Sequence, residues 1–180
     1  MNPVVKAILD RRSIRKYKPK QITKEELDTL IECAKYAPSG KNKQTWHFTV
    51  VQNKEIIDEM NIDFKQVATD NKKIAEEGYH VFYHAPTVIV VSGKEDETYA
   101  QADCASAVEN ILIAAEALGL GSCFVCLVIK IFQKEDLMEK YQGKLQLPEG
   151  YKPLYTVAVG YPEEEGTKHP RKENVVTYIQ

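Results

Sequence analysis

The apolar residues of the chain recur at helical spacing in some segments and as strand-like runs in others. One helix face stands out after Thr23, in Leu27, Leu30, Ile31 and Ala34. Thr23 and Glu26 have the spacing of a capping box, and Ile22 precedes the cap as one half of a hydrophobic staple with Leu27. These signals predict a helix over residues 23–36.

The same pattern, applied along the whole chain, predicts helices separated by short apolar strands. Asn2 before Pro3 predicts a capped opening helix. The predicted helices cover residues 3–10, 23–36, 54–60, 62–77, 99–118 and 133–142. The predicted strands cover residues 46–51, 87–91, 123–128 and 155–160.

The segment 99–118 is apolar around most of its girth, which is typical of a buried helix or a subunit interface. Asp103, Ser106 and Asn110 interrupt its apolar faces and need hydrogen-bond partners. Gly119 is a natural residue to end this helix. Gly119 and Gly121 alone do not make a dinucleotide-binding fingerprint, and no GxGxxG follows a predicted strand.

Length and composition predict one globular domain over residues 1–180. The chain has 43% hydrophobic and 28% charged residues and a net charge of −2. This charge does not predict nucleic-acid binding. No run of 18 apolar residues and no signal peptide is seen, so we expect no membrane association and a cytoplasmic location.

Positive charge is concentrated at the start of the chain. The first 20 residues hold seven lysines and arginines and one acidic residue, whereas the remainder holds 17 basic and 25 acidic residues. Arg11, Arg12 and Arg15 surround Ser13, and arginine forks with a hydroxyl suit a phosphate monoester. A solvated basic face is the alternative interpretation.

A polar loop follows the helix over 23–36 and precedes the strand over 46–51. Its amide and hydroxyl groups come from Ser39, Asn42 and Gln44, and amides can pair with the edge of a planar heterocycle. Loops of this kind often carry function on a rigid scaffold. An ordinary polar surface connection remains the alternative.

The four cysteines predict neither a metal site nor a thioredoxin-like site. Cys123 and Cys126 have CxxC spacing, but they lie inside an apolar strand-like run rather than at a strand-to-helix turn. Cys33 and Cys104 do not supply a second ligand pair for zinc. We expect ordinary buried thiols at all four positions, without disulfides in a reducing compartment.

Taken together, the two polar segments resemble the nitroreductase family of FMN-dependent enzymes. The shared order is Arg-Arg-Ser-x-Arg-x-Tyr at residues 11–17 and then Ala-Pro-Ser-x-x-Asn-x-Gln-x-Trp-x-Phe at residues 37–48. The resemblance continues in four later segments, at residues 85–91, 117–122, 159–162 and 170–172.

The resemblance implies an α+β fold with a central, mostly antiparallel sheet flanked by helices, in an intertwined homodimer with FMN at its interface. It also implies an oxidoreductase that moves hydride from NAD(P)H through flavin N5 to a nitroaromatic, quinone or related acceptor, with ping-pong kinetics. A specialised enone reductase or dehalogenase, or a non-enzymatic flavin-storage protein, is the alternative.

Site residues follow from the resemblance position by position. Contacts to the phosphate, ribityl chain and pyrimidine ring are implied for Arg11, Arg12, Ser13 and Arg15. Contacts to the partner subunit's flavin are implied for Pro38, Ser39, Gly40, Asn42 and Gln44. A strand beside the flavin ring is implied for Ser122, Cys123, Phe124, Val125 and Cys126. Arg171 matches a late basic residue that closes on the phosphate.

The chain departs from the family's pattern near the end of the segment 122–127, and one histidine needs its own interpretation. Many relatives carry a glycine near the end of the segment 122–127, where this chain has Cys126 and Leu127. Either the backbone contact to the ring survives with a side chain present, or the pocket over the ring is narrower, and the substrate range is therefore left open. His47 is interpreted as a strand packing residue rather than a base. No catalytic side chain is predicted.

Overall fold

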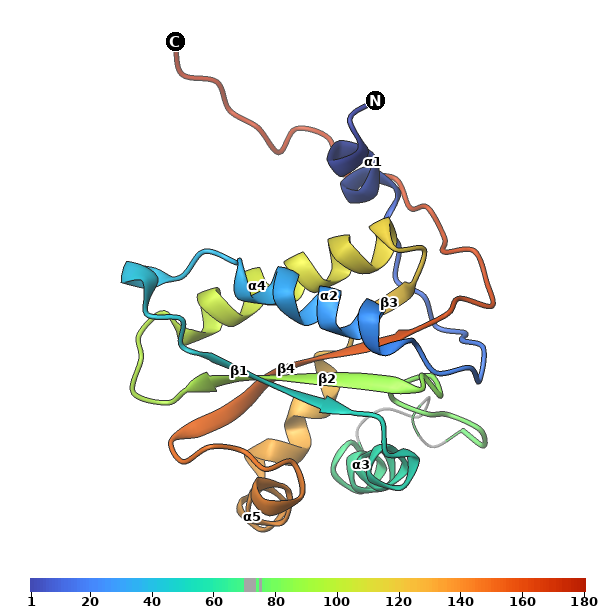
Figure 1. Cartoon of the computed structure of the whole chain (residues 1–180), viewed down its shortest axis with the longest axis vertical. Helices are drawn as coiled ribbons and strands as arrows, with labels where there is room; N and C mark the ends of the chain where they lie inside the picture. Colours follow the sequence, from blue (N-terminus) through green and yellow to red (C-terminus); the bar gives the residue numbers. More distant parts are fainter. Residues whose placement is uncertain (70–73, 75) are drawn as a thin grey trace.

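A four-stranded antiparallel sheet forms the centre of the molecule. The computed structural model describes residues 1–69, 74 and 76–180 (Figure 1). The strands lie in the order β1-β2-β4-β3. They are β1 (Trp46–Val51), β2 (Thr87–Lys94), β3 (Gly121–Phe124) and β4 (Tyr151–Gly160). The strands over 46–51, 87–91 and 155–160 are confirmed, and β2 and β4 are longer than predicted.

Helices cover both faces of this sheet. The α-helices are α1 (Pro3–Asp10), α2 (Lys24–Lys35), α3 (Lys54–Val67), α4 (Ala100–Ala117) and α5 (Glu135–Lys144). The described residues also include the 3₁₀ helices η1 (Gly40–Asn42) and η3 (Leu127–Gln133). Figure 1 shows α2 and α4 on one face and α3 and α5 on the other. No helix in the described ranges is both long and apolar enough to span a lipid bilayer.

Strand β2 separates two hydrophobic cores. Val88 and Val90 pack into the core beneath α3 and η3, while Ile89 and Val91 pack into the core beneath α2 and α4. All four side chains are fully buried. Successive residues of a strand point to opposite faces, so a continuous apolar run is what a strand covered on both sides requires.

The predicted starts of α1 and α2 are confirmed. The Thr23 side chain accepts from the Glu26 N–H, and the Glu26 carboxylate accepts from the Thr23 N–H, which completes the capping box of α2. Leu30 and Ala34 of the predicted apolar face are fully buried. Asn2 caps α1 by accepting from the Val4 N–H. These caps are local interactions, and they were therefore readable from the sequence.

The predicted helix break at Asn61 is wrong. α3 continues through this residue to Val67, because the buried Asn61 side chain accepts from the Val81 N–H at 2.8 Å. A polar residue satisfied by a distant loop does not end a helix. The second helix predicted here, over residues 62–77, falls partly on 70–73 and 75, which lie outside the described residues.

The predicted strand over 123–128 is also wrong beyond Phe124. β3 pairs with β4 only from Gly121 to Phe124, and the chain then turns into η3. Val128, Ile131 and Phe132 are buried at helical rather than alternating spacing. A short apolar run can form either element, and here the packing of η3 against α3 and α5 decides the outcome.

Helix α4 runs across the sheet beside α2, and its polar residues have partners as expected. Asp103 accepts from the Gly40 N–H and from the Thr45 hydroxyl. Ser106 donates to the Ala102 carbonyl, and Asn110 donates to the Cys33 carbonyl. Gly119, at a φ of 72°, follows the helix in the left-handed conformation that favours glycine.

Candidate functional site

The arginine motif forms a strap whose backbone is fixed and whose charged side chains are left available. Its Ser13 forms an isolated bridge with Ser122 of β3, and its Tyr17 forms another with Pro162 just after β4. The Ile14 N–H donates to the Ser122 carbonyl at 2.9 Å. Ile14 and Tyr17 are buried, and these two side chains anchor the strap in the core. The structure thus brings the predicted motif against the predicted β3 segment.

A basic cleft of about 630 Å³ lies between α1, the strap and the late segment around residue 170. Arg11, Arg12 and Arg171, which are 160 residues apart at the extremes, all line it. Its cationic lining exceeds its anionic lining, with Lys6, Arg11, Arg12, Lys168 and Arg171 against Asp10 and Glu109. Such a surplus suits a phosphate dianion, which takes charge-assisted hydrogen bonds from several donors.

Arg12 is held in place at this cleft. Its Nη1 donates to the Leu9 and Arg11 carbonyls, each at 2.7 Å. A Cβ at residue 166 would lie 2.1 Å from the Arg12 Cβ, so the close approach of the two segments requires Gly166. A guanidinium has five N–H donors, and the remaining ones can serve an anion. Arg11 lies 4.0 Å from the exposed Glu109 carboxylate, which is a weak contact.

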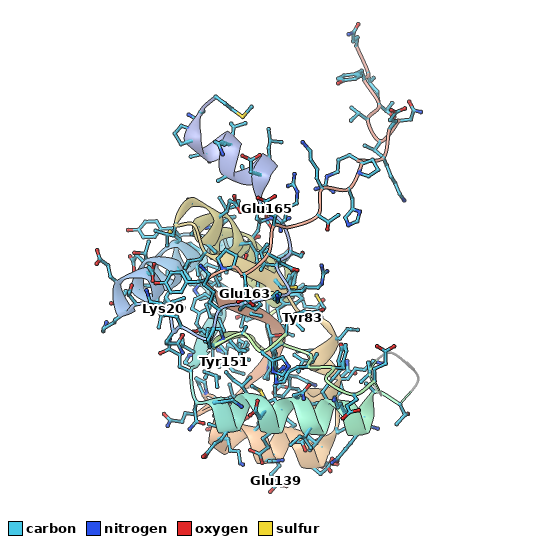
Figure 2. All side chains as sticks on the ribbon, turned by 90° about the vertical axis from the view of Figure 1, so that its right-hand side faces the viewer. Lys20, Tyr83, Glu139, Tyr151, Glu163 and Glu165 are labelled. Atoms are coloured by element: carbon cyan, nitrogen blue, oxygen red, sulfur yellow. The ribbon has the colours of Figure 1, made fainter. Side chains whose placement is uncertain are left out.

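Arg15 does not line the basic cleft and has different neighbours. Its backbone N–H donates to the Glu164 carboxylate at 2.7 Å. Its guanidinium carbon lies 5.7 Å from the centre of the Tyr83 ring. Hydrogen bonding to Tyr83 raises the pKa of Arg15 above its usual value. Figure 2 looks onto this face and labels Tyr83 together with Glu163 of the segment after β4. The motif therefore divides into a cleft group and a separate Arg15.

The β3 segment is buried at its start, and from Cys123 to Cys126 its side chains alternate between the core and solvent. Ser122, Cys123 and Val125 are buried, whereas Phe124 and Cys126 are exposed. Phe124 packs edge-on against Tyr155 with a centroid distance of 5.2 Å. Burial raises the pKa of the Cys123 thiol, and partial desolvation raises that of Cys126. Both thiols are thus protonated near neutral pH.

The prediction of four buried thiols is wrong at two positions. Cys104 and Cys123 are buried, Cys33 is half-buried and Cys126 is exposed. Cys126 lies at the turn between β3 and η3, where the chain has left the sheet. The predicted strand would have buried it.

The polar loop is built around a buried carboxylate. Asp103 of α4 receives the Gly40 N–H at 2.9 Å and the Thr45 hydroxyl at 3.0 Å. The backbone of Lys41, Asn42 and Gln44 is left-handed, with φ between 50° and 55°. Gly40 packs so closely against Tyr99 that a Cβ at this position would lie 2.7 Å from the ring.

The amide groups of this loop face outward. Asn42 and Gln44 are exposed and hydrogen-bond to one another at 3.2 Å. The Gln44 N–H donates to the Ser39 hydroxyl at 3.1 Å. Pro38 is exposed beside them. The five predicted residues of the loop are therefore brought together as one rigid polar surface.

This polar surface and the arginine motif lie apart in the single chain. Figure 1 shows η1 at one end of the α2 and α4 layer, and α1, the strap and β3 towards the other. One chain therefore does not gather the two predicted halves of the site around a single ligand.

His47 of β1 shows packing rather than a catalytic arrangement. It is half-buried, and its ring centre lies 6.0 Å from that of Tyr151. Burial lowers its pKa. This environment agrees with its interpretation as a strand packing residue.

Several residues of the two surfaces were not predicted as site residues. Lys168 and His169 line the basic cleft, Asp103 anchors the polar loop and Tyr83 contacts Arg15. Asp103 is a polar residue in an otherwise apolar predicted helix, and this position indicated that it needs a partner. The sequence around Tyr83 carries no signal of its contact with Arg15.

Helix α1 leaves much of its apolar surface uncovered. Only Ala7 of this helix is buried, while Val4, Val5, Ile8 and Leu9 are exposed. An apolar groove of about 580 Å³ lies where α1, α2 and α4 meet, lined by Val4, Cys33, Tyr36 and Ile113 among others. The last residues are also exposed and apolar, and Figure 1 shows the C-terminal segment extending beyond α1.

Comparison with known proteins gives matches over nearly the whole chain. The model of the nitroreductase family matches residues 8–161. A Bacillus subtilis protein named FMN reductase [NAD(P)H] is 31% identical over 185 residues, which cover 95% of this chain and 70% of the relative.

Two solved structures have the same fold. A Bacteroides fragilis nitroreductase described with bound FMN has a TM-score of 0.91 and 34% identity, with 100% of both chains covered. A Desulfitobacterium hafniense nitroreductase, also described with bound FMN, has a TM-score of 0.93 and 30% identity, with 100% of both chains covered. The α+β arrangement with a central antiparallel sheet is thus confirmed.

Proposed function

The chain belongs to the nitroreductase family, and we propose that it is an FMN-dependent enzyme that transfers two electrons from NAD(P)H to a small nitroaromatic, quinone or related acceptor. The observation that carries this proposal is the basic cleft, where Arg11 and Arg12 of the motif meet Arg171. The B. subtilis relative is named for FMN and NAD(P)H, and two structural neighbours are described with FMN.

The cleft residues would hold the FMN phosphate. Arg11, Arg12 and Arg171 supply charge-assisted donors from two distant parts of the chain, and Lys168 adds to the positive charge. Ser13 and Arg15, further along the same strap, would reach towards the ribityl chain and the ring. One FMN would bind to each single-domain chain of residues 1–180.

The β3 segment would line the ring. Ser122, Cys123 and Val125 are fixed in the core, so the backbone between them offers a rigid wall, while Phe124 and Cys126 face outward. Bound FMN would supply the hydride-accepting and hydride-donating centre. The residues of the chain bind and orient it, and we assign no side chain as acid or base.

The polar loop would serve the flavin of a second copy of the chain. Asn42 and Gln44 lie on a rigid surface far from the arginine motif of their own chain. A homodimer that places this loop opposite the partner's arginine motif would complete two composite sites. The exposed apolar face of α1 and the apolar C-terminal segment would be covered in such a dimer.

The proposal is tested with the purified full-length protein. We expect flavin absorbance bands, saturable binding of FMN by the stripped protein with one site per chain, and oxidation of NADH or NADPH that depends on an added nitroaromatic or quinone. Sedimentation should give twice the mass of the 20.5 kDa chain. Tight FMN binding without turnover of any acceptor would favour flavin storage, and no FMN binding would refute the proposal.

A further inference from the structure

Tyr83 provides the aromatic contact of the arginine that lies outside the basic cleft. The Arg15 guanidinium carbon lies 5.7 Å from the centre of the Tyr83 ring, which is within the range of a cation–π contact. Arg15 itself is exposed, and Tyr83 is half-buried. A flexible charged side chain on a surface thus rests on a ring that the core supports.

The backbone beneath this ring is held in an unfavourable conformation. Tyr83 and His84 both have left-handed backbones, with φ of 55° and 56°. Neither is a glycine, and two successive residues of this kind persist only where their surroundings fix them. Strained backbone of this kind is concentrated at functional sites, which motivates a functional interpretation of the turn.

Buried polar contacts fix the turn from below. The Asn61 side chain of α3 accepts from the Val81 N–H at 2.8 Å. The His80 Nδ1 accepts from the Phe82 N–H at 3.2 Å, while its Nε2 lies 3.3 Å from the Asp58 carboxylate. Val81 and Phe82 are fully buried in the core. The turn is therefore anchored to α3 on one side and presents Tyr83 to the strap on the other.

We propose that Tyr83 is a positioning residue, which fixes the Arg15 guanidinium where the strap turns from the phosphate cleft towards the flavin ring. This inference rests on the proposed FMN site. Arg12 is oriented by two backbone carbonyls, and Arg11 lies in the cleft beside Glu109. Among the described residues, the contacts of Arg15 are the Tyr83 ring at its guanidinium and the Glu164 carboxylate at its backbone N–H. Tyr83 acts through Arg15, and need not touch the cofactor itself.

A positioning role predicts that the effect of Tyr83 depends on Arg15. The Kd of FMN is measured by flavin fluorescence quenching for the unchanged protein, Tyr83→Leu, Arg15→Ala and the double variant. Tyr83→Leu should weaken FMN binding about fivefold, the range of an exposed cation–π contact. In the Arg15→Ala background, Tyr83→Leu should change the Kd of FMN by less than about twofold. Tyr83→Phe keeps the ring but loses the hydroxyl that bonds Arg15, so its loss of FMN affinity should be smaller than that of Tyr83→Leu.

Tyr79→Phe is the matched control. Tyr79 belongs to the same loop and is half-buried, but its ring faces Lys65 at 6.0 Å rather than Arg15. Its FMN affinity should equal that of the unchanged protein. If Tyr83→Leu does not fold, the cycle is repeated with Tyr83→Phe, whose smaller loss must again require Arg15.

Three results overturn the inference. An equal loss in both backgrounds would show that Tyr83 acts on the loop or the cofactor directly, and no loss in either would show that it does not position Arg15. In both cases the unchanged protein still binds FMN, and the proposed function stands. Failure of the unchanged protein to bind FMN would overturn the proposed function, and this inference with it.

Discussion

The arginine strap and the polar loop are two exposed polar surfaces that the fold makes rigid in different ways. The strap takes its position from backbone pairing with β3 and the end of β4, and from two buried side chains, Ile14 and Tyr17. Within the described residues, the left-handed part of the loop pairs with no strand and is held by side chains: the buried Asp103 carboxylate, the Ser39 hydroxyl and an ion pair of Lys43 with Glu97. Backbone pairing supports the strap, whereas side-chain contacts support the loop, with Asp103 as their buried member.

This difference predicts where each surface is vulnerable. Changes to the exposed side chains of the strap should alter ligand binding and leave the fold intact. A change to the anchor of the loop should alter stability and binding together. The two surfaces also lie apart in one chain, so the proposed composite site needs a second copy to bring them together.

The largest effect is expected from removing two arginines of the strap. Arg12→Ala with Arg15→Ala removes two charged hydrogen-bond donors, which should cost about 3 to 6 kcal/mol of FMN binding at about 1.5 to 3 kcal/mol each. Fluorescence titration measures the change in Kd. Thermal unfolding of the FMN-free double variant should differ from that of the FMN-free unchanged protein only by the loss of the two Arg12 hydrogen bonds to backbone carbonyls. Unaltered FMN affinity would refute the assignment of the strap.

Lowering the pH should reduce the stability of the protein through His80, which lies in the turn that carries Tyr83. Burial, together with the neighbouring His84 and Lys54, lowers the pKa of His80 to about 4, against the contact with Asp58 that raises it. As the pH falls below about 6.5, the unfolded chain takes up a proton at this histidine and the native chain does not. The free energy of unfolding should therefore fall by about 3 kcal/mol between pH 6.5 and pH 4.

Urea unfolding across this pH range measures the effect of His80. His80→Asn replaces the titrating ring with a neutral amide, so its free energy of unfolding should vary less over the same range. Against its partial burial, the contacts with Lys54 and His80 lower the pKa of Asp58, so the difference between the two curves reports the histidine together with its pair to Asp58. Parallel curves for the two proteins would contradict a native His80 that stays neutral.

The sequence predicted the elements whose signals are local. The capping residues of α1 and α2 and the apolar run of β1 lie within their own elements, and these were confirmed. The errors at Asn61 and after Phe124 arose where a distant segment decides the outcome. Val81 satisfies Asn61, and packing against α3 and α5 makes a 3₁₀ helix of an apolar run.

The candidate site, too, could be predicted from the sequence only where its signals are local. The residue types and order of the strap and loop were readable, because each motif is continuous in the sequence. The separation of Arg15 from Arg11 and Arg12, and its contact with Tyr83, come from the way the strap crosses between β3 and the turn at residues 80–84. Left-handed backbones at Tyr83 and Gln44 leave no pattern in side-chain types.

A smaller loss is expected from removing the anchor of the polar loop. Asp103→Ala leaves the Gly40 N–H and the Thr45 hydroxyl without their partner, and an unsatisfied buried group costs about 1 to 3 kcal/mol. We expect about 2 kcal/mol less stability in urea unfolding, and weaker FMN binding. Asp103→Asn keeps one acceptor oxygen and should lose less. An Asp103→Ala protein as stable as the unchanged one would show that the loop does not depend on this carboxylate.

The last prediction joins the two surfaces by mixing chains. One homodimer carries Arg12→Ala with Arg15→Ala, and the other carries Asn42→Ala with Gln44→Ala, so each has two damaged sites. In a mixed dimer one site receives both damaged surfaces and the other receives both intact ones. Random pairing makes half the dimers mixed, so activity should return to roughly a quarter of that of the unchanged protein. Subunit exchange is verified by native mass spectrometry of a size-tagged chain, and each homodimer incubated alone is the control. Exchange without recovered activity would mean that the polar loop does not complete the partner's site.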